Sequence, residues 1–131
     1  MANLYSICPS CSVSLDLAMI RIAFARIRSE KEQRLRSWLV ELMSRRKGVL
    51  ETFAAEGVRH EQAFVIASDT GPLLVYVVEA ENHDAAAAAY KKSTLAIDSE
   101  HRAVLNECLC ERVQVEPPTD CALPLPLRGT T

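Results

Sequence analysis

The sequence predicts a single α+β domain in the order β-α-β-β-α-β, with helices on one face of an antiparallel sheet. Three observations predict this fold class. The chain has 131 residues, the length of one domain. Apolar residues make up 49% of the chain and charged residues 24%, which is typical of a globular domain. Segments in which apolar and polar residues alternate, as in strands, are followed along the chain by segments in which apolar residues recur with a helical period.

The first half of the chain predicts one strand and one long helix. We expect the strand at about residues 17–27, where Ile20, Ile22 and Phe24 share one side. Ser29 and Glu32 then form a capping-box pattern. The helix they begin has apolar residues at helical spacing, namely Leu35, Trp38, Leu39, Leu42, Met43, Val49, Leu50 and Phe53. We expect Gly48 to bend this helix and Gly57 to end it.

The second half predicts a hairpin, two helices and a last strand. Strands at 58–68 and 73–78 flank turn residues at 69–72. Asn82 is expected to cap a helix over 84–92, and Asp98 or Ser99 to cap a helix that reaches about residue 112. The last strand would come from 113–115 and 121–123, at an edge because of Pro117 and Pro118. This order is that of the ferredoxin-like fold.

The two ends are expected to lie outside this domain. We interpret residues 1–18 as a weakly ordered N-terminal extension, 19–123 as the ferredoxin-like α+β domain, and 124–131 as a Pro-rich tail. Met19 could be an alternative translation start. Because no basic residue precedes Arg21, the secretory-signal pattern is absent, and we expect a cytoplasmic protein. No apolar stretch is long enough for a membrane span.

The cysteines and histidines give a weak metal signal. Cys8 and Cys11 form a CxxC pair and Cys108 and Cys110 a CxC pair, so a zinc site is conceivable. Cys108, however, lies on the apolar face of its predicted helix, where free cysteine usually acts as a small apolar side chain. The three histidines show none of the usual ligand spacings. We therefore expect no metal and no cofactor.

Charge is unevenly distributed although the net charge is only −2. Residues 21–47 contain nine Lys or Arg against three Glu. A basic surface for an anion would be one interpretation, and Arg46 lies in its best cluster. The glutamates, however, are placed for local ion pairs along the helix, and no aromatic residues accompany the basic ones as single-strand binding requires. We expect no nucleic-acid partner.

The predicted sheet has apolar side chains on both faces. In the segment 73–78, both alternating sets are apolar, namely Leu73, Val75 and Val77, and then Leu74, Tyr76 and Val78. A sheet with one solvated face should instead alternate apolar and polar residues. Because the helices cover one face, we expect the sheet of a second copy to cover the other in a homodimer. The alternative is that the C-terminal tail folds over this face.

His101 is the first candidate for chemistry. It lies four residues after Ile97 and four before Leu105, on the apolar side of its predicted helix. Asp98 stands one turn earlier and could orient the imidazole, which would make His101 a general acid or base. The alternative is structural: Asp98 caps the helix and His101 is hydrogen-bonded and half-buried.

A second group of candidates lies on the strands. His60 and Gln62 share one side of their strand with Phe64 and Ile66. If that side faces inward, His60, Gln62 and Tyr76 line a polar spot in an apolar cavity, as in many ligand pockets. Alternatively, His60 is solvated at the start of the strand.

Several segments resemble a family of small bacterial proteins of unknown function: Leu35-Arg36-Ser37-Trp38, Val49-Leu50-Glu51-Thr52, Glu56-Gly57-Val58, Leu74-Val75-Tyr76 and Ile97-Asp98-Ser99-Glu100-His101-Arg102. The resemblance covers about residues 19–109, extends to the segment Cys121-Ala122-Leu123-Pro124, and does not include the first eighteen residues. The family is similar to the dimeric α+β barrel superfamily, which includes small monooxygenases, haem-degrading enzymes and lactone isomerases. The resemblance implies a cavity between helix and sheet but carries over no catalytic residue.

Two functional hypotheses follow. In the first, the homodimer binds a small apolar or aromatic molecule, with cofactor-free monooxygenase- or isomerase-like chemistry that uses His101, His60 and Tyr76. In the second, it is a non-catalytic dimeric binding or regulatory module, and these side chains are structural. Convergence of the three side chains on one closed pocket would favour the first hypothesis.

Overall fold

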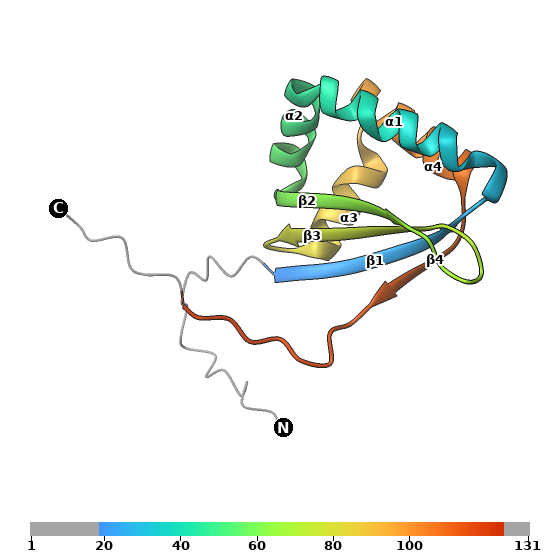
Figure 1. Cartoon of the computed structure of the whole chain (residues 1–131). Coiled ribbons are helices and arrows are strands. Elements are labelled where there is room, and N and C mark those ends of the chain that lie inside the picture. The colour runs from blue at the N-terminus through green and yellow to red at the C-terminus, as the bar shows by residue number, and fades with distance from the viewer. Residues whose placement is uncertain (1–18, 125–131) are drawn as a thin grey trace.

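The structure is a computed structural model and describes residues 19–124. The extension over 1–18, with Cys8 and Cys11, and nearly all of the tail over 124–131 lie outside these residues. One antiparallel sheet has the order β2-β3-β1-β4, with strands β1 (Met19–Ile27), β2 (Val58–Ile66), β3 (Leu73–Ala80) and β4 (Leu109–Val115). The helices gather on one side of it (Figure 1): α1 (Glu32–Ser44), α2 (Arg46–Glu56), α3 (His83–Lys92) and α4 (Ala96–Cys108). The predicted fold class is confirmed.

The start of α1 differs from the predicted capping box. Ser29 belongs to a short 3₁₀ turn, η1 (Ser29–Lys31), and no side chain caps either η1 or α1. In this turn the backbone N–H of Lys31 donates to the carbonyl oxygen of Arg28, at 2.8 Å. Tight 3₁₀ turns of this kind are frequent where α-helices begin. The expectation of a Ser29–Glu32 capping box is therefore wrong.

The long helix predicted over residues 29–57 is two helices. The break falls at Arg45, whose φ and ψ of −104° and 39° are not helical, and not at Gly48. Gly48 instead allows close packing, because a Cβ there would lie 3.1 Å from Cδ1 of Ile97 on α4. Gly57 ends α2 with a φ of 74°, as expected for a left-handed cap.

The ends of the later elements also differ from prediction. Asn82 caps α3 as expected, since its Oδ1 accepts from the N–H of Ala85 at 2.9 Å. By contrast, Leu95 is the N-cap of α4 and Asp98 lies inside its first turn. This helix ends at Cys108, and β4 follows at Leu109 without a loop. The segment 121–123 forms no strand.

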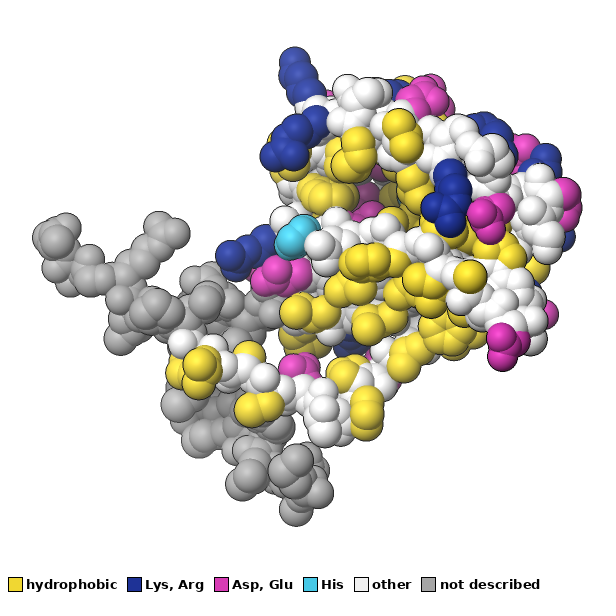
Figure 2. All heavy atoms as spheres, viewed as in Figure 1, with side chains coloured by type: hydrophobic (Ala, Val, Ile, Leu, Met, Phe, Trp, Pro, Cys, Tyr) yellow, Lys and Arg dark blue, Asp and Glu magenta, His cyan; other side chains and the backbone are white. Residues whose placement is uncertain are grey.

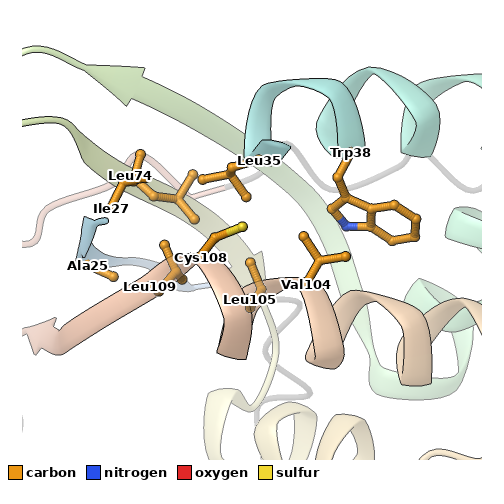
Figure 3. Close-up of a cluster of buried hydrophobic side chains, with 9 residues drawn as sticks. All are labelled: Ala25, Ile27, Leu35, Trp38, Leu74, Val104, Leu105, Cys108 and Leu109. Carbon is orange, nitrogen blue, oxygen red and sulfur yellow. The ribbon is translucent and has the colours of Figure 1, made fainter. Parts of the chain in front are cut away.

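The core lies between the sheet and helices α1 and α4. Its largest fully buried side chains are Ile27, Leu35, Leu74 and Cys108, and they meet in one cluster with Trp38 (Figure 3). Cys108 thus packs as a small apolar side chain, in agreement with its predicted position. Among the described residues, no helix is both long and apolar enough to cross a membrane.

The other face of the sheet is apolar and uncovered by the described residues. We call it the open sheet face and define it by side chains that adjoin across paired strands: Ile20, Ile22, Phe24, Phe64, Ile66, Val75, Val77, Val113 and Val115. In Figure 2, hydrophobic side chains form a continuous patch over these strands. Ile20 is 58% exposed and Phe64 is 45% exposed. Both faces of the sheet are therefore apolar, as the alternation predicts.

Candidate functional site

A cavity of about 370 Å³ lies between the sheet and the helices. On β1, Phe24 belongs to the open sheet face, so Ala23 and Ala25 on the other side of the strand point toward the helices. Methyl groups leave space there that larger side chains would fill, since protein interiors are otherwise close-packed. The rest of the apolar lining comes from both layers: Leu42, Val49, Phe53, Leu74, Val78, Ile97, Leu105 and Leu109.

A hydrogen-bonded chain of three aromatic side chains reaches the cavity. Nε1 of Trp38 on α1 donates to Nδ1 of His101 on α4, at 2.8 Å. Nε2 of His101 lies 3.2 Å from the hydroxyl oxygen of Tyr76 on β3. Because an indole nitrogen can only donate, Nδ1 must accept and carries no proton.

The protonation of this chain follows from burial. Burial lowers the pKa of His101 to about 4, against an opposing effect of the nearby Asp98. At neutral pH the imidazole is therefore uncharged, and its one proton is on Nε2. Nε2 donates to the Tyr76 oxygen, so the hydroxyl hydrogen of Tyr76 is free to donate elsewhere. Burial also raises the pKa of Tyr76, which keeps the phenol protonated.

Tyr90 on α3 adds a second hydroxyl to the lining. Its oxygen is buried and has no hydrogen-bond partner among residues 19–124. The Tyr90 ring meets the His101 ring edge-on, with centroids 6.1 Å apart. The guanidinium carbon of Arg102 lies 5.4 Å from the centre of the Tyr90 ring. Since buried polar groups are normally hydrogen-bonded, the unpaired hydroxyl suits a site that takes up a polar ligand group.

Carboxyl groups line the part of the cavity formed by α2 and β2. The Thr52 hydroxyl lies 2.8 Å from Oε1 of Glu56 and 2.6 Å from Oδ2 of Asp98. A hydroxyl has one proton, so only one of these carboxyls can accept it. Burial, with a further contribution from the charge of Asp98, raises the pKa of Glu56. The Thr52 hydroxyl thus joins two carboxyl groups, one on α2 and one on α4.

Glu61 on β2 is the carboxyl with the most altered acidity. Burial, with a further contribution from the charge of Glu56, raises its pKa to about 7. The register pairs Glu61 with Val78, and both side chains line the cavity. Figure 2 shows the opening between helices and sheet, with acidic side chains inside it. A carboxyl that is half ionised at neutral pH is suited to proton transfer.

The structure brings some of the sequence candidates together and separates others. Tyr76, Asp98 and His101 all line the cavity. Asp98 does not orient His101, however, because its carboxylate accepts from Thr52 and Ser93. Trp38 orients the imidazole instead.

His60 and Gln62 lie on the opposite side of β2 from Glu61 and are exposed. They therefore do not line the cavity with Tyr76, and His60 is solvated near the start of β2, which is the alternative interpretation of the sequence. The side of β2 that contains Phe64 and Ile66 belongs to the open sheet face, so the apolar pattern there did not indicate the interior. Arg46 is exposed at the start of α2 and does not line the cavity. It is Arg45 that pairs with Glu100 of α4.

Three further lining residues, Glu56, Glu61 and Tyr90, are not predicted by the sequence pattern. The signal for Glu61 was present in the strand alternation, but choosing its inward side required knowing which face the helices cover. Within residues 19–124, no group of three or more His, Cys, Asp or Glu side chains could hold a metal ion.

Comparisons with known proteins give a family and a fold. Residues 18–123 match the model described as "Family of unknown function (DUF6176)", which confirms the resemblance to a family of unknown function. No curated protein matches the chain.

Two solved structures are similar in fold. One, assigned as an antibiotic biosynthesis monooxygenase from Nitrosomonas europaea, is 16% identical, with 73% of this chain and 84% of that chain covered and a TM-score of 0.46. The other, Rv0793 from Mycobacterium tuberculosis, is 19% identical, with 79% and 97% covered and a TM-score of 0.47. These likenesses concern the arrangement of strands and helices and do not bear on activity.

Proposed function

The chain belongs to the DUF6176 family, whose function is unknown, and we propose that it binds a small, mostly apolar molecule in the cavity between helices and sheet. The observation that carries this proposal is the Trp38–His101–Tyr76 chain, which leaves the Tyr76 hydroxyl free to donate. A largely apolar wall with a few fixed polar groups is typical of ligand sites, and such cavities span roughly 300–1,000 Å³.

The ligand we propose has an aromatic or aliphatic ring and a hydrogen-bond acceptor such as a carbonyl oxygen. The ring would pack against apolar side chains such as Leu74, Ile97 and Leu105. The acceptor oxygen would accept a hydrogen bond from the Tyr76 hydroxyl. We propose cofactor-free, isomerase- or monooxygenase-like chemistry at this site, since a fixed donor and a carboxyl of near-neutral pKa are groups that proton transfer requires.

We also propose that the protein is a homodimer in which two open sheet faces meet. Monomeric proteins rarely expose contiguous apolar patches larger than a few hundred Å². The open sheet face extends over all four strands, from Ile66 on β2 to Val115 on β4. A second copy has an identical apolar surface, and twofold symmetry makes such a surface complementary to itself.

Binding can be followed through Trp38, because it is the sole tryptophan of the chain and donates to His101 beside the cavity. We expect β-tetralone, a small aromatic ketone, to change the Trp38 fluorescence saturably. Tyr76→Phe removes the donor and should weaken binding about 10-fold, the value of one hydrogen bond. Equal affinity in wild type and Tyr76→Phe would contradict the role of Tyr76.

Tyr5→Phe is the matched control, because Tyr5 precedes the region that matches the family. This variant should bind as wild type does. The alternative function, a non-catalytic binding module, would be favoured if β-tetralone binds but is never chemically changed.

A further inference from the structure

We propose that Glu61 is the general base that removes a proton from a carbon next to a carbonyl group, while Tyr76 holds the carbonyl oxygen. This inference rests on the proposed function, because it requires the ligand to occupy the cavity. It names the substrate class as a small cyclic or aromatic carbonyl compound with an acidic C–H bond beside the carbonyl.

The two side chains are placed by the register of β2 and β3. Glu61 pairs with Val78, and Ala63 pairs with Tyr76. Glu61 and Tyr76 are therefore diagonal neighbours on the side of the sheet that faces the helices. Diagonal positions on adjacent strands are roughly 7–8 Å apart. A carbonyl oxygen and the neighbouring carbon of one ligand fit between a donor and a base at that separation.

Glu61 also lies where the cavity meets a second pocket of about 180 Å³. Glu56, Glu61 and Tyr90 line both spaces. The second pocket has a polar rim, with His83 and an ion pair between Arg21 and Glu116 at 3.2 Å. A base in this position contacts the apolar cavity on one side and a polar exit on the other, so its proton can exchange with water.

Other charged and titratable groups line the two spaces that Glu61 lines. They are Arg21 of β1, Glu56 of α2, Tyr76 of β3, His83, Asp84 and Tyr90 of α3, Asp98 and His101 of α4, Arg112 of β4, and Glu116. Burial and Glu56 together hold the pKa of Glu61 near 7. The carboxylate is then more basic than an ordinary glutamate, yet it is still populated at neutral pH, as a general base requires.

The reaction step balances without an oxidant or a metal. The Glu61 carboxylate takes the proton, and the electron pair of the broken C–H bond forms the carbon–carbon double bond of an enolate. The negative charge moves to the carbonyl oxygen, which accepts a hydrogen bond from the Tyr76 hydroxyl, while Nε2 of His101 donates a hydrogen bond to the Tyr76 oxygen, so that Tyr76 keeps its proton. Protonated Glu61 then returns its proton to the same carbon, or to the far end of a conjugated system to give an isomer.

The test is hydrogen–deuterium exchange at the benzylic methylene of β-tetralone, followed by proton NMR in D₂O under nitrogen. Wild type should exchange this position faster than buffer alone, with a rate that rises with pH through about 7. Glu61→Gln should lower the rate about 100-fold or more, the usual contribution of a general base. The affinity measured through Trp38 should stay close to that of wild type.

Two further variants make the result specific. Glu51→Gln is a matched change at an exposed site on α2 that does not line the cavity, and this variant should exchange as wild type does. Glu61→Asp withdraws the carboxylate by one methylene and should lose about 10-fold while it retains the pH profile. If Glu61→Gln does not fold, this smaller change still decides the question.

The outcomes separate this inference from the function on which it rests. If wild type binds β-tetralone but exchanges it no faster than buffer, the role of Glu61 is overturned and ligand binding stands. Equal exchange in wild type and Glu61→Gln also overturns it. If wild type does not bind β-tetralone, the proposed function fails as well.

Discussion

Replacing Val75 with aspartate is expected to convert the proposed dimer to a monomer. Val75 pairs with Phe24 on β1 and with Phe64 on β2, so it lies at the centre of the open sheet face. In a dimer joined through this face, the aspartate would be buried without a partner, which costs several kcal/mol. The dissociation constant should rise by roughly 1,000-fold. Light scattering at micromolar concentration would detect the change.

Val40→Asp is the matched control, because Val40 is 72% exposed on α1, on the helical side of the domain. This variant should remain a dimer, and circular dichroism should show that both variants are folded. A wild-type protein that is already monomeric at this concentration would contradict the proposed assembly.

Removing Glu61 is expected to make the protein much less stable in acid, because His101 then lowers the stability with no opposing effect from Glu61. Burial lowers the pKa of His101 to about 4, so the unfolded chain binds a proton that the folded chain does not as pH falls from about 6.5 to 4. The stability that the neutral His101 contributes is therefore present above pH 6.5 and is lost on acidification.

Glu61 has the opposite effect. Its pKa is raised to about 7, so the folded chain holds a proton that the unfolded chain has released between about pH 4.5 and 7. Glu61 therefore lowers the free energy of unfolding as pH rises, and Glu56, whose pKa is also raised, acts in the same direction. The opposing effects of His101 and Glu61 should leave wild-type stability nearly level over the range they share.

Urea unfolding of two variants separates these contributions. Glu61→Gln should lose roughly 2–3 kcal/mol of stability between pH 6.5 and 4.5, since one pKa unit corresponds to about 1.4 kcal/mol. His101→Gln should instead gain stability over the same range. Parallel stability curves for wild type and both variants would contradict the placement of these groups.

The order of elements could be predicted because its signals are local. Alternation marks β1 and β3, and Asn82 and Gly57 mark helix ends through contacts within a few residues. The break at Arg45 could not be predicted in this way. The close approach of Gly48 to Ile97 joins helices that are far apart in sequence, so its meaning appears only after folding.

The site was predictable only in part, for a related reason. His101 and Tyr76 were found because each lies among apolar neighbours on one face of its element. Glu61 was missed because β2 has apolar residues on both sides, and the strand alone does not show which side the helices cover. Asp98 was assigned to His101 by proximity in sequence, whereas its partner Thr52 is 46 residues away.

The proposed function depends on Trp38 and His101 making the Tyr76 hydroxyl a hydrogen-bond donor toward the cavity. Nitrogen NMR of the protein labelled with ¹⁵N in histidine tests this most directly. We expect His101 to show an unprotonated Nδ1 and a protonated Nε2 from pH 8 down to about 5, and we expect Trp38→Phe to disturb this pattern. A protonated Nδ1, or a charged imidazolium at neutral pH, would contradict it, because Tyr76 would then lack the fixed donor that frees its own hydrogen.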